Sequence, residues 1–373
     1  MYGKYKNHDL QVFVTIIHDL NYFCIMKQNI RNIQKSDLSK WVTDIGENKY
    51  RTTQIFDWIW KKGVTDFKDM PNIPNNLRNM LDEHFYFNGI YLENVQKSKD
   101  TTIKALFRLY DNSFIEGVII PSAERITICI SSQVGCKLKC KFCATGTIGF
   151  KRNLEAGEIY DQVKILNDLS LEHFNKRITN IVFMGMGEPL YNYTNVTGAI
   201  HWISSDEGLG FSSKRITLST IGIPVMIKKM ADDQIKYNLA VSLHSAIQEK
   251  RKNIMPVSRN HTLELLLESL QYFTKITKNK ITFEYVLLKG INDSQEDAEA
   301  LIKYASHLAN KINLIEYNPV EGLPFQKSGK SEVFNFMQYI KNKGMNVQLR
   351  VSRGEDIDAA CGQLANKLLT KPS

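Results

Sequence analysis

Strand-like and helix-like segments alternate over residues 101–373, and this alternation limits the fold more than any other feature of the sequence. Short apolar runs bounded by turn residues predict strands, and the longer amphipathic runs between them predict helices. The predicted helices include Leu154–Leu169, Thr262–Ile276 and Ser294–Leu308. The predicted strands are Ile126–Ser131, Ile178–Met184, Arg215–Thr220, Asn238–Leu243, Ile281–Leu287 and Ile312–Tyr317, with a last one at Asn346–Val351. Six such β/α units predict an α/β fold, a parallel sheet that closes partly into a TIM-like (β/α)6 barrel.

The chain before this region has a different pattern. We expect residues 1–25 to be a poorly constrained extension, with Met26 as an alternative start, and residues 26–100 to be a small helical accessory domain. Its helices are predicted to begin at Ser36 as an N-cap, to run over Arg51–Lys62, and to resume at Asn75–His84 after a break at Pro71 and Pro74. Two tryptophans beside two lysines (Trp58, Trp60, Lys61 and Lys62) suggest an RNA contact, although core packing of the tryptophans is the more common role of such residues.

Charge and cysteine placement narrow the class of protein. The net charge is +9, with 14 Lys/Arg against 12 Asp/Glu in residues 1–100 and 34 against 27 in the rest. A basic second part suits a polyanionic partner such as RNA. Four of the six cysteines fall within residues 129–143, which indicates a metal or redox site in a reducing compartment rather than a disulfide framework. No signal peptide or membrane-length apolar run is evident, so we expect a cytoplasmic protein, and nothing suggests that it is other than a monomer.

The residues that suggest chemistry follow the predicted strands rather than precede them. Cysteines follow the first strand, Gly187 and Glu188 the second, and Ser219, Ser242, His244 and Asn318 stand at the ends of later ones. In a β/α barrel the carboxyl ends of all strands lie on the face where active sites are assembled. The sequence therefore predicts an enzyme with its site on that face.

The first cluster has the spacing C-x3-C-x2-C, formed by Cys136, Cys140 and Cys143. Three thiolates in a short loop can hold three corners of a [4Fe-4S] cluster and leave the fourth iron open for S-adenosylmethionine (SAM). Phe142 is then expected to shield the cluster from water. Zinc is the alternative, but it needs a fourth ligand, and neither His nor Cys occurs in the twenty-five residues that follow.

Several long motifs make a resemblance specific. Phe183-Met-Gly-Met-Gly-Glu-Pro-Leu190, the run from Ile126 to Cys136, Cys140-Lys-Phe-Cys-Ala-Thr-Gly146 and the segment Arg353–Leu364 closely resemble the RlmN family, in the same order and over about residues 35–364. The resemblance implies the radical SAM barrel with a C-terminal catalytic loop. It also implies an enzyme that methylates carbon 2 of adenine in 23S rRNA (adenosine 2503) and in tRNA (adenosine 37), with a [4Fe-4S] cluster and two SAM molecules per methyl group.

The same resemblance implies roles for single residues. Cys361 would carry the methyl group as S-methylcysteine, and Cys129 would attack the Cys361 sulfur to release the product, forming a disulfide bond. Glu116 would remove the proton from carbon 2. Without the resemblance, Cys129 in an apolar strand and Glu116 alone would be assigned to packing and to solvent, respectively. The SAM pocket would be formed by Gly187, Glu188, Ser219, Ser242, Leu243, His244 and Asn318.

Other assignments stay open at this stage. Cfr-type methyltransferases share the cysteines but modify carbon 8; Pro189 and the Glu355-Asp356 pair favour carbon 2. A radical SAM enzyme with a different acceptor is a second alternative, and a non-catalytic zinc protein that binds RNA is a third. The reductant is expected to be a flavodoxin or ferredoxin. The preference between rRNA and tRNA does not follow from the sequence, and Cys24 has no assigned role.

Overall fold

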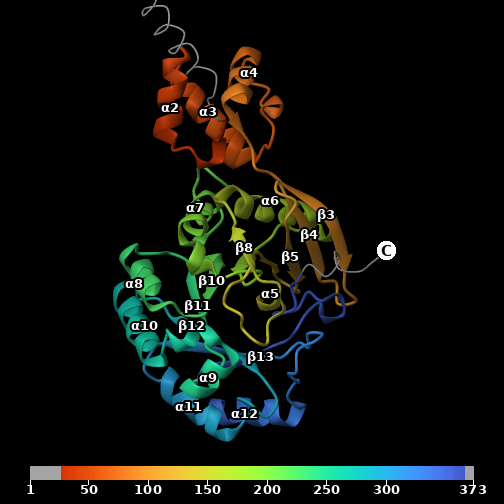
Figure 1. Ribbon diagram of the computed structural model, residues 1–373, viewed down its shortest axis with the longest axis vertical. Coiled ribbons are helices and arrows are strands. Elements are labelled where there is room, and N and C mark those ends of the chain that lie inside the picture. The colour runs from red at the N-terminus through yellow and green to blue at the C-terminus, as the bar shows by residue number, and fades with distance from the viewer. Residues whose placement is uncertain (1–26, 366–373) are drawn as a thin grey trace, which may run out of the picture. The chain divides into compact units, whose positions relative to one another are not determined.

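The computed structural model describes residues 27–365, which divide into two compact units at Asn88/Gly89 (Figure 1). The predicted extension 1–25, Met26 and Cys24 lie outside the described residues. The sequence placed the boundary between the accessory domain and the barrel at residue 100, whereas the structure assigns residues 89–100 to the second unit. The reason is a strand, β3 (Ile90–Lys97), that pairs with the main sheet of that unit.

The first unit is mainly helical. Over residues 27–88 its helices are α2 (Lys35–Asp44), α3 (Tyr50–Phe56) and α4 (Asn75–His84), and α3 continues into a π-helical turn over Asp57–Lys62. Short 3₁₀ turns lie at Ile30–Asn32 and Phe67–Asp69, and the two-residue strands β1 (Gln28–Asn29) and β2 (Phe85–Tyr86) pair in parallel. Apolar side chains from each helix form one core: Leu38, Val42, Ile55, Ile59, Leu77 and Leu81.

Two expectations about this unit require comment. The helix expected after Ser36 begins at Lys35, with Gln34 in the extended N-cap position, so Ser36 is not the cap. Trp60 is 1% exposed and belongs to the core, which favours the packing interpretation for that residue. Trp58 is half-buried, and its indole N–H donates to the Asn72 side chain.

The second unit is built on a ten-stranded sheet with the order β14-β13-β12-β11-β10-β9-β6-β5-β4-β3. Its first seven strands run parallel to one another: β6 (Ile126–Cys129), β9 (Asn180–Phe183), β10 (Ile216–Thr220), β11 (Asn238–Ser242), β12 (Ile281–Leu287), β13 (Asn310–Glu316) and β14 (Val347–Arg350). All seven predicted strands are present, within two residues at either end. Among the described residues β14 pairs only with β13, so the barrel is partial, as predicted.

Helices connect the parallel strands in the predicted alternation. Figure 1 shows α8, α10, α11 and α12 along the outer side of the strands. The connecting helices are α6 (Ala156–Phe174), α7 (Tyr193–Ser204), α8 (Pro224–Asp232), α10 (Leu263–Thr277), α11 (Gln295–Ala305) and α12 (Lys330–Asn342), with two short ones, α5 (Ala144–Thr147) and α9 (Gln248–Ile254). Such crossovers bring the carboxyl ends of all seven strands to one edge.

Three antiparallel strands that the sequence did not reveal extend the sheet beyond β6. They are β3, β4 (Ile103–Leu109) and β5 (Phe114–Pro121), and β5 pairs with β6 through Val118 and Cys129. A separate hairpin of β7 (Gln133–Gly135) and β8 (Phe150–Asn153) encloses the cysteine loop. Within residues 27–365, no helix combines the length and the apolar character needed to span a bilayer.

Candidate active site

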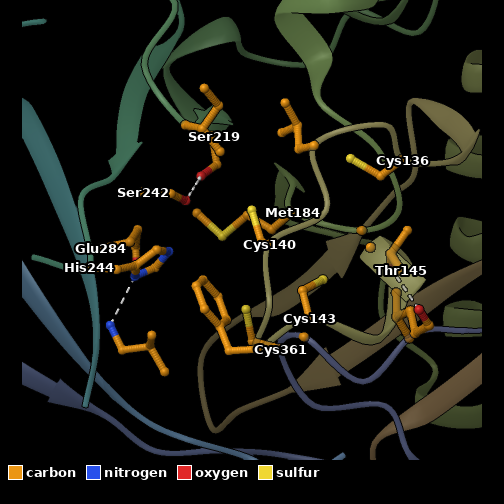
Figure 2. A pocket seen from close by; sticks show the side chains of 18 of the residues that line it. Cys136, Cys140, Cys143, Thr145, Met184, Ser219, Ser242, His244, Glu284 and Cys361 are labelled. Atoms are coloured by element: carbon orange, nitrogen blue, oxygen red, sulfur yellow. Dashed lines mark hydrogen bonds between the residues drawn. The ribbon is translucent and has the colours of Figure 1, made fainter. Parts of the chain in front are cut away.

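A cavity lies at the carboxyl ends of the parallel strands and is lined by residues that follow them (Figure 2). Most of the lining residues named below come from strand ends or from two loops, which we call the cluster loop (residues 136–143) and the C-terminal loop (residues 353–365). Of the thirteen predicted site residues, ten line this cavity: Cys129, Cys136, Cys140, Cys143, Gly187, Glu188, Ser219, Ser242, His244 and Cys361. Leu243, Asn318 and Glu116 do not.

Backbone contacts hold the cluster loop in place. The Cys136 N–H donates to the Gly149 carbonyl at 2.7 Å, and the Cys143 N–H donates to the Cys140 carbonyl at 3.2 Å. Gly135 has φ +72°, and a Cβ there would lie 1.8 Å from the Gly149 oxygen, so only glycine fits before Cys136. Most of these contacts are close to the loop in the sequence, and one is distant: the Lys141 N–H donates to the Ile254 carbonyl at 2.9 Å.

The three thiols of the cluster loop share one electrostatic environment. Burial raises the pKa of Cys136 to about 12. Burial, and then the charges of Cys143 and Cys136, raise the pKa of Cys140 well above its usual value. Positive charge, which a group of iron ions would provide, favours Cys136 and Cys140 as thiolates at this cavity wall.

The donor set fits an iron–sulfur cluster. Three free cysteines that line one cavity match a cluster with three protein ligands and one open iron. In the described part of the chain, no three His, Cys, Asp or Glu side chains are placed to hold a single metal ion. Phe142 is 9% exposed and packs edge-on against His244, with ring centroids 4.9 Å apart, on the cavity wall where shielding was expected.

The Gly-Met-Gly-Glu segment after β9 is held tightly against the strand ends. Gly187 has φ +101°, and a Cβ there would lie 2.6 Å from the Gln133 side chain. Glu188 is 2% exposed, and its two carboxylate oxygens accept the N–H groups of Leu190 at 3.0 Å and Ile221 at 2.9 Å. Burial raises its pKa to about 7 although these hydrogen bonds oppose the shift. Glu188 thus joins the loop after β9 to the end of β10.

The polar residues at β10 and β11 form the opposite wall. The hydroxyls of Ser219 and Ser242 lie 3.5 Å apart at neighbouring strand ends. Leu243 is fully buried outside the cavity lining, and its N–H donates to the Glu284 carbonyl at 3.0 Å. Its contribution to a cofactor site is therefore confined to shaping the loop between Ser242 and His244.

His244 is fixed as a neutral donor. Its Nδ1 accepts the Val286 N–H at 3.0 Å, which leaves the ring proton on Nε2. Burial, and then the Arg251 charge, lower its pKa to about 3. The backbone at His244 is left-handed, with φ +56°, and its carbonyl accepts from the Asn292 amide at 2.6 Å. An imidazole held in this way offers a hydrogen-bond donor without charge.

Cys129 and Cys361 line the same cavity as the cluster loop. Cys129 ends β6 and is 7% exposed, whereas Cys361 on the C-terminal loop is exposed to the solvent in the cavity. Burial and the neighbouring Cys361 raise the pKa of Cys129 to about 12, and the Arg350 guanidinium opposes this shift. The protein around Cys361 also raises the pKa of its thiol, again opposed by Arg350.

The C-terminal loop is held against the cluster loop by side chains and backbone from distant parts of the chain. The Ala144 N–H donates to the Gly362 carbonyl at 2.8 Å, and the Thr145 hydroxyl donates to the Leu364 carbonyl at 2.7 Å. Asn318, which is outside the cavity lining, donates from its amide to the Cys361 carbonyl at 3.2 Å. This hydrogen bond from Asn318 helps to hold the backbone of Cys361 in place.

Glu116 lies behind the C-terminal loop, in β5. It is fully buried, its carboxylate accepts the Ala365 N–H at 2.9 Å, and it pairs with Lys104 at 3.3 Å. Its place in the middle of an antiparallel strand was hidden from sequence reasoning because β3–β5 were not recognised as strands.

Sequence reasoning missed a group of three cavity residues that contact one another: Met184, Glu284 and Arg350. Arg350 Nη1 lies 3.2 Å from the Met184 sulfur and 3.8 Å from Glu284 Oε2. Although burial opposes it, the negative charges of Glu284, Cys361 and Cys129 raise the pKa of Arg350. One signal was available: Glu284 is a charged residue in the middle of the apolar run Ile281–Leu287, and buried charges are rarely left unpaired.

Known proteins resemble this chain in both of its units. Residues 28–87 match the family model described as the ribosomal RNA large subunit methyltransferase N-terminal domain, and residues 130–304 match the radical SAM superfamily. A crystal structure of a radical SAM methyltransferase from Sphaerobacter thermophilus superimposes with a TM-score of 0.85 at 35% identity, and the match covers 90% of this chain and 99% of that one. Fold, cluster loop and strand-end cavity thus define a radical SAM methyltransferase.

Curated relatives give the family. A probable dual-specificity RNA methyltransferase RlmN from Flavobacterium johnsoniae is 49% identical over 92% of this chain and 98% of its own length. The dual-specificity RNA methyltransferase RlmN from Lawsonia intracellularis is 43% identical, with 92% and 98% covered. The chain belongs to the RlmN family.

Proposed function

We propose that the protein methylates carbon 2 of adenine in RNA, at adenosine 2503 of 23S rRNA and adenosine 37 of tRNA. The observation that carries the proposal is the convergence of Cys129 and Cys361 on the cavity that the cluster loop also lines. A methyltransferase that used only a nucleophilic substrate would have no need of two further thiols beside the cofactor site. The names of the relatives support RNA as the substrate.

The residues that line the cavity suit both cofactors. Cys136, Cys140 and Cys143 would hold a [4Fe-4S] cluster, and the wall formed by Gly187, Ser219, Ser242 and His244 would hold SAM. When bound, the cluster would supply the electron that converts SAM into methionine and a 5′-deoxyadenosyl radical, a species able to remove a hydrogen atom from a methyl group. We expect a flavodoxin or ferredoxin to deliver that electron.

Cys361 is proposed as the methyl carrier. Its thiol is exposed in the cavity, and the sulfur is nucleophilic as a thiolate. Arg350 faces it and favours the thiolate by charge. The thiolate would take the methyl group from SAM, with S-adenosylhomocysteine as the leaving group. Loss of one hydrogen atom from that methyl group to the radical would leave a carbon radical that bonds to the adenine, so the RNA becomes attached to the C-terminal loop through the Cys361 sulfur.

Cys129 is proposed to release the product. Its thiolate would attack the Cys361 sulfur, forming the S–S bond as the bond from that sulfur to the RNA-bound carbon breaks. Both thiols are free in the described structure and line one cavity, and after burial the neighbouring Cys361 is the next cause that raises the pKa of Cys129. Arg350 faces both of them.

Glu116 is proposed as the base that takes the proton from carbon 2. Its bond to the Ala365 N–H offers a rival role, that of positioning the C-terminal loop. Glu116→Gln separates the two, because glutamine still accepts that N–H but cannot act as a base. If Glu116 is the base, the variant accumulates RNA attached to Cys361; if it only positions the loop, turnover is largely retained.

Carbon 8 is the alternative acceptor, as in Cfr-type enzymes. The two positions that favour carbon 2 have structural roles here. Pro189 begins a 3₁₀ turn beside Glu188, and Asp356 accepts from the Ser98 hydroxyl at 2.5 Å and the Lys99 N–H at 3.1 Å. Both therefore act on the placement of loops around the cavity, which is how they would influence the choice of carbon.

The proposal is tested with reconstituted enzyme, SAM, reduced flavodoxin and protein-free rRNA or tRNA under anaerobic conditions. Nucleoside mass spectrometry with chromatographic standards distinguishes the two methyladenosines. We expect 2-methyladenosine from both RNAs. Formation of 8-methyladenosine would assign the enzyme to the alternative, and SAM cleavage without any RNA product would reject RNA as the substrate.

A further inference from the structure

A second hollow lies on the inner face of the partial barrel, toward the amino ends of the strands. In a closed β/α barrel the inward positions carry bulky branched apolar residues that fill the interior. Here alternate positions along the parallel strands, which point to one face, carry polar side chains instead. We call this hollow the inner groove; its polar strand residues are Thr127, Asn180, Thr217, Thr282, Lys311, Asn313 and Gln348. A polar interior of this kind can form hydrogen bonds with a polar ligand.

The inner groove adjoins the active-site cavity. Met184, Glu284 and Arg350 line both hollows. A ligand in the groove would therefore lie against Arg350, which also lines the cavity of Cys129 and Cys361, whereas none of the cluster cysteines lines the groove.

The charge of the groove is strongly positive. Its basic side chains are Arg125, Lys311, Arg350 and Arg353, and Glu284 is its only carboxylate. Glu284 is compensated within the protein, by Arg350 at 3.8 Å and by the Asn313 amide at 2.8 Å. Over residues 27–365 no carboxylate forms an ion pair with Arg125, Lys311 or Arg353, and both arginines are exposed. Three cations that form no ion pair within residues 27–365 suit a run of phosphates.

Amide side chains lead from the groove toward the cavity. Gln348 Nε2 donates to Asn313 Oδ1 at 2.9 Å, and Asn313 in turn donates to Glu284. Amides carry donors and acceptors side by side, the pattern that pairs with base edges. Hydroxyls of Thr217 and Thr282 add further polar groups to the same surface.

We propose that the inner groove binds a single-stranded segment of the RNA substrate, with Arg125, Lys311 and Arg353 on its phosphates and the target base directed past Arg350 to Cys361. This inference rests on the proposed function and adds the route by which the substrate enters. An acidic electron carrier is less well suited, because the groove borders the cavity at Arg350 rather than at the cluster loop, and because its lining consists of strand side chains inside the partial barrel.

The test is binding of a synthetic RNA hairpin with an unpaired adenine to the reconstituted enzyme, measured over a series of salt concentrations. Arg125→Glu, Lys311→Glu and Arg353→Glu are each compared with Lys341→Glu, the same change at an exposed lysine of α12 outside the groove. We expect each groove variant to weaken binding about fivefold or more and to lower the salt slope by about 0.7, the value for one lost phosphate contact on a single strand. Lys341→Glu should leave both unchanged.

Folding is controlled by the conservative variants Arg125→Lys and Lys311→Arg, which should restore binding, and by thermal unfolding of every variant. Equal binding by the groove variants and Lys341→Glu would overturn the proposal. So would a selective loss of reduction by flavodoxin with RNA binding intact, which would assign the groove to the electron carrier. If the wild-type enzyme binds the hairpin through the groove but methylates no RNA, the proposed function fails and the groove stands.

Discussion

The cluster loop and the C-terminal loop both bring thiols to the same cavity, but they are built differently. The cluster loop is shaped mainly by neighbours in the sequence: a glycine turn at Gly135, the Gly149 carbonyl and its own Cys140–Cys143 turn. The C-terminal loop is held mainly from outside. Its Gly354 N–H donates to Asp100 at 3.0 Å, and Ser98 and Thr145 bond to Asp356 and Leu364.

This difference teaches how the two sets of thiols are specified. Ligands for a cluster are fixed by spacing within a few residues, so the site forms wherever that loop folds. The reactive Cys361 depends instead on the turn between β3 and β4 and on α5, which are far away in the sequence. We therefore expect variants to separate the functions of the two loops.

The largest effect is expected from removing a ligand. Cys140→Ala should lose the cluster, and with it both SAM cleavage and methyl transfer should fall to background. Cys361→Ala should keep the brown cluster and SAM cleavage while RNA methylation alone is lost. Iron content, visible absorption and 5′-deoxyadenosine formation measure the three properties. A Cys361→Ala enzyme that still methylates RNA would remove the C-terminal loop from the mechanism.

A second variant tests the cooperation of the two cavity thiols outside the cluster loop. Cys129→Ala should form the bond between Cys361 and RNA but fail to break it, so turnover stops at or below one per enzyme. The attached RNA should appear as a slower band on a denaturing gel, sensitive to ribonuclease. Multiple turnovers without such a band would show that Cys129 only fills space at the end of β6.

A smaller effect is expected where the two loops meet. Thr145→Val removes the hydroxyl that donates to Leu364 and leaves a buried carbonyl without that donor, at a cost of about 1–2 kcal/mol. Hydrogen exchange should rise over residues 353–365 but not over the cluster loop. Thr147→Val is the matched control, because the Thr147 hydroxyl donates to the Ala144 carbonyl within α5, at 2.7 Å, and forms no hydrogen bond with residues 353–365. Equal exchange in both variants would contradict the proposed anchoring.

As the pH falls, the stability that depends on His244 should decrease before the anchor of the C-terminal loop is weakened. Burial lowers the pKa of His244 to about 3, so the unfolded chain binds a proton between pH 6.5 and 3 that the folded chain excludes. His244 therefore favours folding above pH 6.5 and opposes it progressively below, by about 2 kcal/mol at pH 5 relative to pH 7. His244→Asn, which can still accept the Val286 N–H, should flatten urea-unfolding stability over that range. An unchanged pH profile would contradict a neutral, buried His244.

The anchor of the C-terminal loop should respond to acid later. Although burial opposes it, hydrogen bonds from Thr102 and Gly354 lower the pKa of Asp100 to about 2. Its contribution is present above the ordinary carboxyl pKa and is lost as the pH falls from about 3.8 toward 2. Hydrogen exchange at Gly354 in Asp100→Asn should match wild type at pH 3 more closely than at pH 6, and the reverse order would be inconsistent with this anchor.

The sequence predicted the parts of this molecule whose pattern is local. Apolar runs located all seven parallel strands, and their polar ends located the cavity, because the topology of β/α units brings those ends together. It did not predict β3–β5, whose mixed, partly exposed pattern does not alternate cleanly: β3 is mostly exposed while β4 is almost entirely buried. Consequently it missed that Glu116 is enclosed in a strand behind the loop it was expected to serve.

Residues that act through other residues were also hidden. Asn318 was expected at the cofactor, and its amide also bonds to the Cys361 carbonyl, a contact that the sequence did not indicate. Arg350 gave no signal in the sequence, since an arginine in a terminal strand is ordinary, and its importance arises only from the convergence of Glu284, Cys129 and Cys361 around it. Long-range contacts of this kind are visible only in the folded structure.

The measurement that tests the central claim most directly follows one methyl group. The enzyme is first loaded with SAM that carries a deuterated methyl group, freed of excess SAM, and then mixed with RNA, reductant and unlabelled SAM for a single turnover. If Cys361 carries the carbon that reaches the RNA, intact-protein mass spectrometry shows the label on Cys361 before the reaction, and the first 2-methyladenosine contains it. An unlabelled first product from a labelled enzyme would contradict the account.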